Sequence, residues 1–199
     1  MSRRSRRDRS LWVVDPARSA IRFAVAVGHL AGVQGCCARF SGLLVWDDRS
    51  GQPVAVGVEI DAGGVVAGQT QCDLRLHPGD FLDVETYPTI TFGSRRLDVL
   101  RADRIRVSGA LRLHGVVRPI ELEATLAAID PRPDGCDTMR FTATTDINRY
   151  DFGLRWSQPL DGVRIGDRIH IELDIVAVRV EPGADLGPVP AGLDPILAS

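Results

Sequence analysis

The feature that most constrains the fold of this chain is a repeated alternation of apolar and polar residues. In residues 104–113 (RIRVSGALRL), Ile105, Val107, Leu111 and Leu113 share one parity, and the arginines and the serine share the other. A period of two places neighbouring side chains on opposite faces of an extended chain. The segment therefore predicts a β-strand with one buried face.

The next segment (RPIELEATL) shows the same alternation with the apolar parity inverted. A turn at residues 114–117 (HGVV) would join the two segments as an antiparallel hairpin. We expect Leu111 to lie near Leu122 on the inner face and Arg112 near Glu121 on the outer face, because cross-strand pairs match in burial and charge.

Similar alternation recurs along the chain and, with the hairpin, predicts about eight strands. Turn-forming residues separate the strands, and many antiparallel strands with one apolar face form either a sandwich or a barrel. A closed barrel is favoured because it leaves no exposed edge. The inward-facing residues of the other strands are predicted to be Ile21, Phe23, Val25 and Val27; Phe40, Gly42, Leu44 and Trp46; Val54, Val56, Val58 and Ile60; Ile90 and Phe92; Met139, Phe141 and Ala143; and Ile169, Ile171, Leu173 and Ile175.

Composition and charge divide the chain into one domain with two polar ends. Residues 1–10 form a basic arm without aliphatic residues beyond Met1, and residues 181–199 are rich in Pro and Gly; we expect both to be disordered and dispensable. Residues 11–180 form the single folded domain. The formal net charge of −2 provides no field that would recruit nucleic acid.

Hydropathy predicts no stable membrane insertion. No apolar run reaches the ~18 residues that a spanning helix needs, and no signal-peptide core follows the arginines of the arm. A cytoplasmic protein is therefore expected.

The cysteines agree with a reducing compartment. Cys36, Cys37, Cys72 and Cys136 form no C-x-x-C motif, and no histidine stands at metal-ligand spacing. We expect free thiols and no metal site.

An acidic stretch, residues 79–92 (GDFLDVETYPTITF), raises the question of a catalytic cluster. Asp80, Asp83 and Glu85 have no His, Lys or metal-ligand partner at a telling spacing. Residues 63–85 lack the period of two and suit short helical turns, in which Phe81 and Val84 would pack inward. A structural cap is the favoured interpretation.

Six motifs in order carry a resemblance to a known family. They are W-x-x-D-P-x-x-S-x-I-x-F at residues 12–23, ARFSG at 38–42, DFLDVETYPTITF at 80–92, GALRLHGVVRPIEL at 109–122, INRYDFGL at 147–154 and GDRIHIELDI at 166–175. Together they resemble the YceI family. The resemblance implies an all-β fold with a short helical cap: an eight-stranded antiparallel lipocalin-like barrel whose apolar lumen holds a polyisoprenoid, often the tail of an isoprenoid quinone. It implies no catalytic residue and no cofactor.

The chain departs from the family pattern at polar positions. Where the pattern resembles Ser-x-Asp-Thr-Gly followed by Arg-Asp-x-His-Leu, Val66 and Cys72 stand in place of the Asp and the Arg. Loss of both members of a possible charge pair is easier to tolerate than loss of one, because a lone buried charge is costly. His29 is also displaced by two positions from the family's F-x-V-x-H pattern.

We expect the partner to be a long-chain polyisoprenoid or similar apolar lipid, and the sequence leaves open a homodimer. A barrel enzyme acting on a quinone or lipid through His29, His114 or Asp151 is one alternative, and a filled structural module is another. The predicted ligand-binding residues of the lumen are Ile21, Phe23, Val25, Phe40, Leu44, Val56, Val58, Ile90, Phe92, Val107, Leu111, Leu122, Leu126, Phe141, Phe152 and Leu173.

The cysteine interpretation gives a first prediction. Thiol titration of the purified, denatured protein should find all 4 cysteines reduced, and a reducing agent should change neither its melting temperature nor its compactness. A count of two or fewer thiols would contradict the reduced, cytoplasmic assignment.

Overall fold

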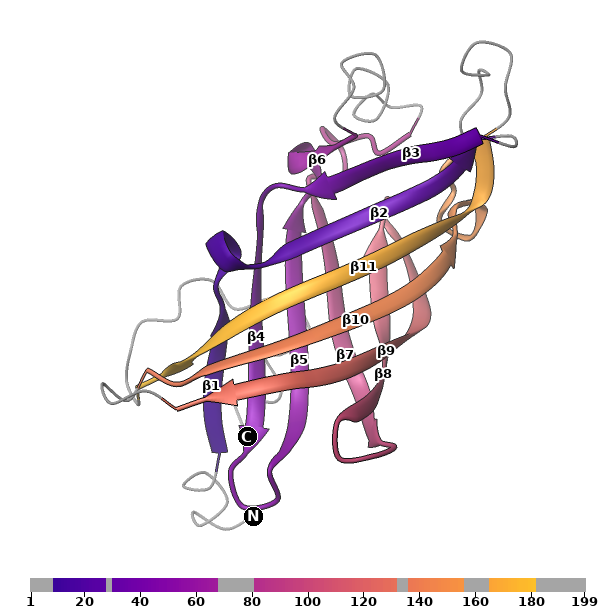
Figure 1. Cartoon of the computed structure of the whole chain (residues 1–199). Helices are drawn as coiled ribbons and strands as arrows, with labels where there is room; N and C mark the ends of the chain where they lie inside the picture. Colours follow the sequence, from indigo (N-terminus) through magenta and orange to yellow (C-terminus); the bar gives the residue numbers. More distant parts are fainter. Residues whose placement is uncertain (1–8, 28–29, 68–80, 132–135, 156–164, 182–199) are drawn as a thin grey trace.

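The structure, a computed structural model, describes residues 9–27, 30–67, 81–131, 136–155 and 165–181. It is built almost entirely of antiparallel strands (Figure 1). The strands are β1 (Arg9–Val14), β2 (Ala20–Val27), β3 (Leu30–Cys37), β4 (Phe40–Asp47), β5 (Gln52–Asp61), β6 (Val65–Val66), β7 (Thr89–Val99), β8 (Arg104–Leu113), β9 (Val116–Asp130), β10 (Thr138–Asn148) and β11 (Ile165–Val180). Single 3-10 turns lie at η1 (Pro16–Arg18), η2 (Ala62–Gly64) and η3 (Arg149–Phe152).

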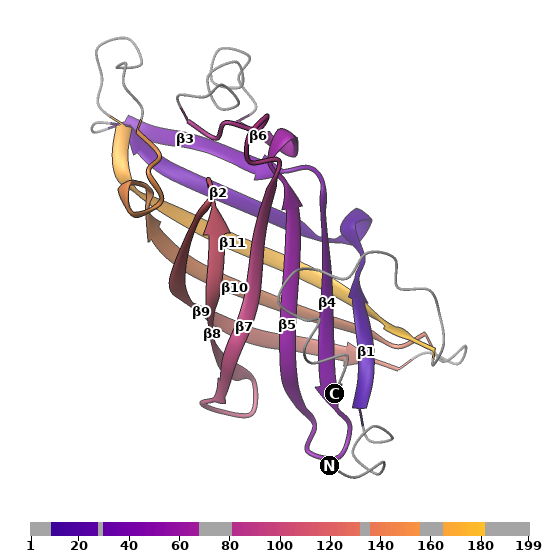
Figure 2. The same ribbon diagram turned by 180° about the vertical axis from the view of Figure 1, so that it is seen from behind.

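The predicted barrel is confirmed: eight strands close into an antiparallel ring. The ring runs β1-β4-β5-β7-β8-β9-β10-β11, and β11 pairs back onto β1 through Leu11↔Val180 and Val14↔Ala177. In Figure 1, β10, β11 and β2 cross the front, and in Figure 2, seen from behind, β4, β5 and β7 form the opposite wall.

The alternation of apolar and polar residues did not predict β1, the strand that closes the ring. β11 pairs with β2 from Ile165 to Asp174 and then with β1 from Ala177 to Val180, so β1 and β2 share one neighbour and are separated by η1. On its other side, β2 pairs with β3, and β3 pairs with β6. Neither β1 (RSLWVV) nor the glycine-containing β3 (LAGVQGCC) shows strict alternation, which explains why the sequence did not reveal them.

The hairpin of β8 and β9 has the predicted faces but a different register. Its turn has two residues, His114 and Gly115, both with positive φ (50° and 72°), as a type I′ turn requires. Val116 already pairs with Leu113, so Leu122 lies opposite Val107. The predicted pairs of Leu111 with Leu122 and Arg112 with Glu121 are therefore wrong, because the predicted turn was too long.

A shift of register in β5 shows that the predicted inward direction of Val54 is wrong. Val45 pairs with Ala55 and Trp46 with Pro53, so Val54 is an extra residue between them. Val54 packs with outward-facing residues instead of the lumen, whereas Val56, Val58 and Ile60 keep the predicted inward direction.

Two parts of the segment predicted to form helical turns, residues 63–85, are described: residues 63–66 belong to η2 and β6, and residues 81–85 lie in turns. The backbone N–H groups of Thr86 and Tyr87 both donate to the carbonyl of Asp83, which has a φ of 45°. Phe81 and Leu82 are buried and Val84 packs against the same core cluster. Asp80 and the rest of the predicted cap, residues 68–80, lie outside the described residues.

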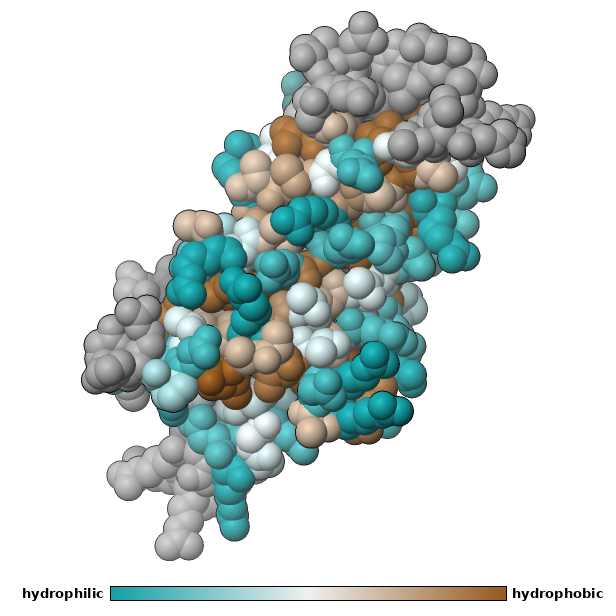
Figure 3. All heavy atoms as spheres, viewed as in Figure 1, coloured by the Kyte–Doolittle hydropathy of each residue, from teal (hydrophilic) through white to brown (hydrophobic). Residues whose placement is uncertain are grey.

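The outer wall is largely polar. On the face seen in Figure 1, hydrophilic side chains cover much of the surface (Figure 3). Exposed residues such as Arg112, Glu123 and Arg140 alternate with buried inward residues on β8, β9 and β10. On these three strands the buried apolar side chains thus face the lumen.

Two glycines with positive φ provide a matched stability test. A Cβ on Gly115 would lie 2.5 Å from Cε1 of Tyr87, whereas a Cβ on Gly51 (φ 64°) would meet no atom within 4 Å. We expect Gly51→Ala to lower the free energy of unfolding by about 1 kcal/mol through backbone strain alone, and Gly115→Ala by about 2 to 3 kcal/mol through strain and crowding. Urea denaturation measures both values. Equal losses of unfolding free energy would show that the Tyr87 side chain moves away from the added methyl group without a measurable cost.

Candidate ligand-binding lumen

The barrel encloses two apolar cavities of about 130 Å³ each. They share Ile21, Ile60, Leu111 and Ile171 as walls, so they are successive parts of one lumen. We call them the lower cavity, at the end of the barrel near Trp46, and the upper cavity, at the end near Phe81. A lumen of this kind suits a slender ligand, since a small eight-stranded barrel has room for side chains or one small molecule.

The lower cavity is lined almost wholly by aliphatic and aromatic side chains. Its one polar residue is Thr145, whose hydroxyl donates to the backbone carbonyl of Glu121 at 2.7 Å. The predicted residues that line it are Ile21, Phe40, Leu44, Val56, Val58, Phe92, Val107, Leu111, Leu122, Leu126, Phe141 and Leu173.

The upper cavity lies between β2, β3, β11 and the turns at residues 81–87. It contains the predicted residues Phe23, Val25 and Ile90, with Ile21 and Leu111 shared. Phe81 and Leu82 close one side, and Val33 and Cys37 contribute from β3.

The sequence-based list contains one residue that lines neither cavity and omits several that do. Phe152 is buried in η3 but lines neither cavity. Trp46, Met139 and Ile175 line the lower cavity; they belong to predicted inward rows, and that parity could have added them to the candidate site. Val14, Val33 and Cys37 lie on β1 and β3, which carry no alternation signal.

Polar side chains replace the apolar ones where the lumen ends beyond Trp12. Along β1, β10 and β11, the inward rows pass from Trp12, Met139 and Ala177 to Ser10, Asp137 and Arg179. We call Ser10, Asp48, Asp137 and Arg179 the polar end network.

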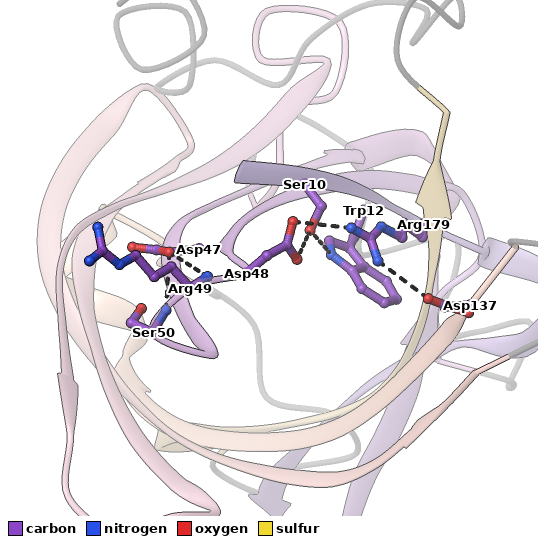
Figure 4. Close-up of polar contacts among 8 residues, drawn as sticks. All are labelled: Ser10, Trp12, Asp47, Asp48, Arg49, Ser50, Asp137 and Arg179. Carbon is purple, nitrogen blue, oxygen red and sulfur yellow. Dashed lines mark hydrogen bonds and ion pairs between the residues drawn. The ribbon is translucent and has the colours of Figure 1, made fainter. Parts of the chain in front are cut away.

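Arg179 is the centre of the polar end network (Figure 4). One guanidinium nitrogen donates to Asp48 at 3.0 Å and another to Asp137 at 3.4 Å. Trp12 Nε1 donates to Ser10 Oγ, which donates to Asp48 in turn (2.9 and 2.8 Å). The network joins β1, β11, the β4–β5 turn and the residue before β10, so it ties together the strands that close this end of the ring.

Of the alternative catalytic groups, His114 and Asp151 line neither cavity. His114 stands in the hairpin turn, where its ring meets Tyr87 edge-on and Nδ1 lies 3.2 Å from the carbonyl oxygen of Phe152. Asp151 is exposed, and His29 lies outside the described residues. His170 is on the outer face, where a hydrogen bond to Asp146 raises its pKa.

The one described cysteine at the lumen is chemically quiet. Burial, with a smaller contribution from Cys36, raises the pKa of the Cys37 thiol to about 12. Because the thiolate is the nucleophilic form, Cys37 is a poor nucleophile at neutral pH. Cys36 is an exposed free thiol, Cys136 is exposed, and Cys72 lies outside the described residues.

The described residues provide neither a metal-binding group nor a membrane-spanning helix. They contain no group of three or more His, Cys, Asp or Glu side chains that could hold a metal ion. Within the same ranges, no helix is both long enough and apolar enough to span a membrane.

Comparison with known proteins agrees with this geometry. The model of the YceI-like domain matches residues 12–177. The chain belongs to the YceI-like family. A UPF0312 protein of Pseudomonas putida (strain W619) is 30% identical over 141 residues, covering 68% of this chain and 73% of its own. A UPF0312 protein of Vibrio parahaemolyticus is 28% identical over 145 residues, covering 72% and 77%.

Solved structures show the same fold. BcnA of Burkholderia cenocepacia superposes with a TM-score of 0.72 at 21% identity, over 82% of this chain and 98% of its own. A polyisoprenoid binding domain from Saccharophagus degradans, implicated in plant cell wall breakdown, superposes with a TM-score of 0.60 at 16% identity, over 87% and 99%.

The YceI-like motif at residues 147–154 has a structural role in this chain. Arg149 is only 4% exposed, and it donates to the backbone carbonyls of Leu154 and Gly166, both at 3.0 Å. Its guanidinium also stacks on the ring of Tyr150 at 4.1 Å. The side chain of Asn148 caps the turn by accepting from the N–H of Tyr150. Arg149 also lines the upper cavity. Its hydrogen bonds to the carbonyls of Leu154 and Gly166 hold η3 against the start of β11.

The polar end network gives a testable contribution to stability. Arg179→Met keeps much of the apolar stem but leaves Asp48 and Asp137 without their shared cation. Because these side chains are partly exposed (38%, 36% and 21%), we expect a loss of about 1 kcal/mol in unfolding free energy at low salt. The loss should shrink in 1 M NaCl.

Arg96→Met is the control for this network, since Arg96 makes an ion pair with Asp98 while its side chain is 75% exposed. It should change stability little. Equal effects of the two substitutions in urea denaturation would contradict a special role for Arg179.

Proposed function

We propose that this protein binds a long polyisoprenoid, or the isoprenoid tail of a quinone, in the barrel lumen and serves as a binding or carrier protein. The observation that carries the proposal is the run of apolar walls through both cavities, from Trp46 to Phe81. Aliphatic and aromatic side chains suit a methyl-branched chain and offer little to a polar metabolite.

The free energy of burying apolar groups favours recognition of the ligand through its isoprenoid tail. Burial of each CH₂ group is worth about 0.8 kcal/mol, so a few isoprene units supply a large gross affinity even after the ordering of a flexible chain is subtracted. Two polar residues of the walls are bonded to the protein itself, Thr145 to Glu121 and Arg149 to backbone carbonyls, and Arg22 also lines the upper cavity. We therefore propose that the lumen selects for an isoprenoid chain more strongly than for a particular head group.

The solved relative from Saccharophagus degradans supports this reading because it is described as a polyisoprenoid binding domain. Its 16% identity to this chain establishes a shared fold, so the ligand comes to this chain as a proposal. A cytoplasmic location is likewise a proposal, and it rests on the expected free thiols.

A substitution that fills the lumen tests the proposal. Val107 is buried and lines the lower cavity, whereas Arg112 on the same strand is exposed. Val107→Trp should block the chain and reduce retention of a polyprenol or menaquinone at least tenfold, and Arg112→Trp should leave retention unchanged. Binding is measured by native mass spectrometry and by extraction of lipid from the purified protein.

Folding must be established before binding is compared. Overpacking by Val107→Trp is expected to cost about 1 to 3 kcal/mol, so circular dichroism should show an unaltered strand content in both variants. Leu122→Trp on the facing strand repeats the test, with the exposed Glu123→Trp as its control. Unchanged retention in both lumen variants would exclude the lumen as the binding site.

The same experiment separates the two alternatives. A filled structural module would yield no lipid from the native protein after mild purification and would bind none when a polyprenol is added. An enzyme would convert added quinone or lipid to a product detectable by mass spectrometry, and His114→Ala or Asp151→Ala would stop that conversion.

A further inference from the structure

The hairpin of β7 and β8 exposes two apolar side chains at its tip. Val99 is 40% and Leu100 50% exposed. Of the large hydrophobic residues that are exposed in the described ranges, only these two are neighbours in the sequence. The loop between β7 and β8 projects from the end of the barrel at which β4 ends (Figures 1 and 2). We call residues 95–104 the hairpin tip.

The apolar side chains of the hairpin continue from the lumen past the rim of the barrel. Leu97 and Ile105, one on each strand, line the lower cavity. Val99 pairs with Ile105 and follows Leu97 by two residues, so it has the same parity. Its exposure has a simple cause, because β7 pairs with β5 only as far as Gly93 and continues beyond that neighbour. The inner row of the hairpin therefore runs from the lower cavity to the exposed tip.

Backbone hydrogen bonds fix the shape of the turn. The N–H groups of Leu100 and Arg101 donate to the carbonyl of Arg104 at 2.8 and 3.2 Å, and the N–H of Arg104 donates back to the carbonyl of Arg101 at 3.3 Å. The N–H of Leu126 on β9 donates to the carbonyl of Asp103 at 2.8 Å. Since these bonds use main-chain atoms, the side chains of the tip can contact a partner without loss of the turn.

Arginine side chains surround the two apolar residues. Arg101 and Arg104 flank the turn, and Arg95 and Arg96 follow one another on β7; all four are exposed. The register of β7 against β8 shifts between Ser94 and Arg96, so Arg95 is an extra residue in the strand. A bulge of this kind allows two consecutive side chains to reach solvent.

The hairpin tip is positively charged, although the whole chain is not. It holds four arginines against two aspartates, Asp98 and Asp103, whereas the formal net charge of the chain is −2. Asp98 is paired with Arg96 at 2.8 Å. The other three arginines make no ion pair with any residue of the described part of the chain. Their charge is thus available to an external anion.

An anionic lipid surface matches both features of the tip. Aliphatic side chains gain free energy by leaving water for the boundary between head groups and acyl chains. Arginines beside them then lie near the lipid phosphates, where each basic residue strengthens binding about fivefold. A nucleic acid would engage the arginines but leave Val99 and Leu100 in water. A neutral apolar protein surface would leave the arginines without a partner.

We propose that the hairpin tip docks reversibly on an anionic membrane, with Val99 and Leu100 at the boundary between head groups and acyl chains. The contact is peripheral, and no segment crosses the bilayer. The inference goes beyond the proposed function, because docking requires no ligand in the lumen. Where the lumen carries an isoprenoid, docking brings the lower cavity next to the bilayer through Leu97 and Ile105.

Sedimentation of the full-length protein with vesicles tests the apolar part of the surface. Vesicles of phosphatidylcholine with phosphatidylglycerol should bind the protein, and vesicles of phosphatidylcholine alone should bind it at least about tenfold more weakly. Leu100→Asp should weaken binding to the anionic vesicles at least about tenfold. Val117→Asp is the matched control, since Val117 is 43% exposed on β9 and lies outside the tip. Equal binding by the two variants would overturn the proposal.

Neutral substitutions test the charge. Arg101→Gln combined with Arg104→Gln should weaken binding to the anionic vesicles about twentyfold. Arg112→Gln combined with Arg140→Gln, which removes two exposed arginines elsewhere on the outer wall, should leave it unchanged. Circular dichroism first establishes that every variant keeps its strand content. Equal losses in the two double variants would mean that the tip has no special role.

A fluorescent label locates the residues that enter the lipid. Leu100→Cys, made after the four native cysteines have been changed to serine, would carry a nitrobenzoxadiazole group. Its emission should increase and shift to shorter wavelength on anionic vesicles, whereas the same label at Val117→Cys should not respond. Equal responses at both positions, or none at position 100, would contradict the proposal.

Two other results would assign the hairpin tip to a different partner and overturn membrane docking. The first is binding of double-stranded DNA that the arginine substitutions abolish, together with vesicle binding that Leu100→Asp leaves intact. The second is a dimer in sedimentation velocity that Leu100→Asp converts to a monomer, because the tip would then be covered by a second copy. The vesicles contain no isoprenoid, so either result leaves the proposed function of the lumen unaffected.

Discussion

Pairing of β1 with β11 is the constraint on which the rest of the structure depends. It joins Leu11 to Val180 and Val14 to Ala177, residues from opposite ends of the domain. Without it the sheet would keep two long open edges, and the apolar face would have no enclosed volume to surround. The polar end network reinforces the same seam, since Arg179 of β11 reaches Asp48 in the β4–β5 turn and Asp137 before β10.

Closure makes the two faces of the sheet chemically different. The lumen retains unfilled space between largely apolar walls, and the polar side chains of Thr145 and Arg149 are bonded to the protein itself. Such a site can distinguish ligands by length, width and branching more readily than by charge. Val66, which stands in place of the Asp of the family pattern, lines neither cavity; it pairs with Cys36 as part of β6.

Much of the candidate site followed from parity, and its errors occurred where local geometry interrupts the period of two. The predicted lumen residues other than Phe152 line at least one of the two cavities. Phe152 follows the last paired residue of β10 and lies in a 3-10 turn, where strand parity no longer applies. Val54 left its predicted face because a single extra residue reverses the direction of side chains, and the alternation of valines in VAVGV conceals that residue.

The sequence by itself determined that the chain forms amphipathic strands, which side chains on most of them share a face, and that the fold is a barrel of the YceI-like family. These are consequences of local periodicity and of motif order. Only the tertiary structure decided that the hairpin turns in two residues, that β1 closes the ring, and that leucine and valine residues on the outer wall are buried. The physical reason is that strand register and burial depend on partners far away in the chain, whereas alternation reports only which neighbouring side chains point in opposite directions.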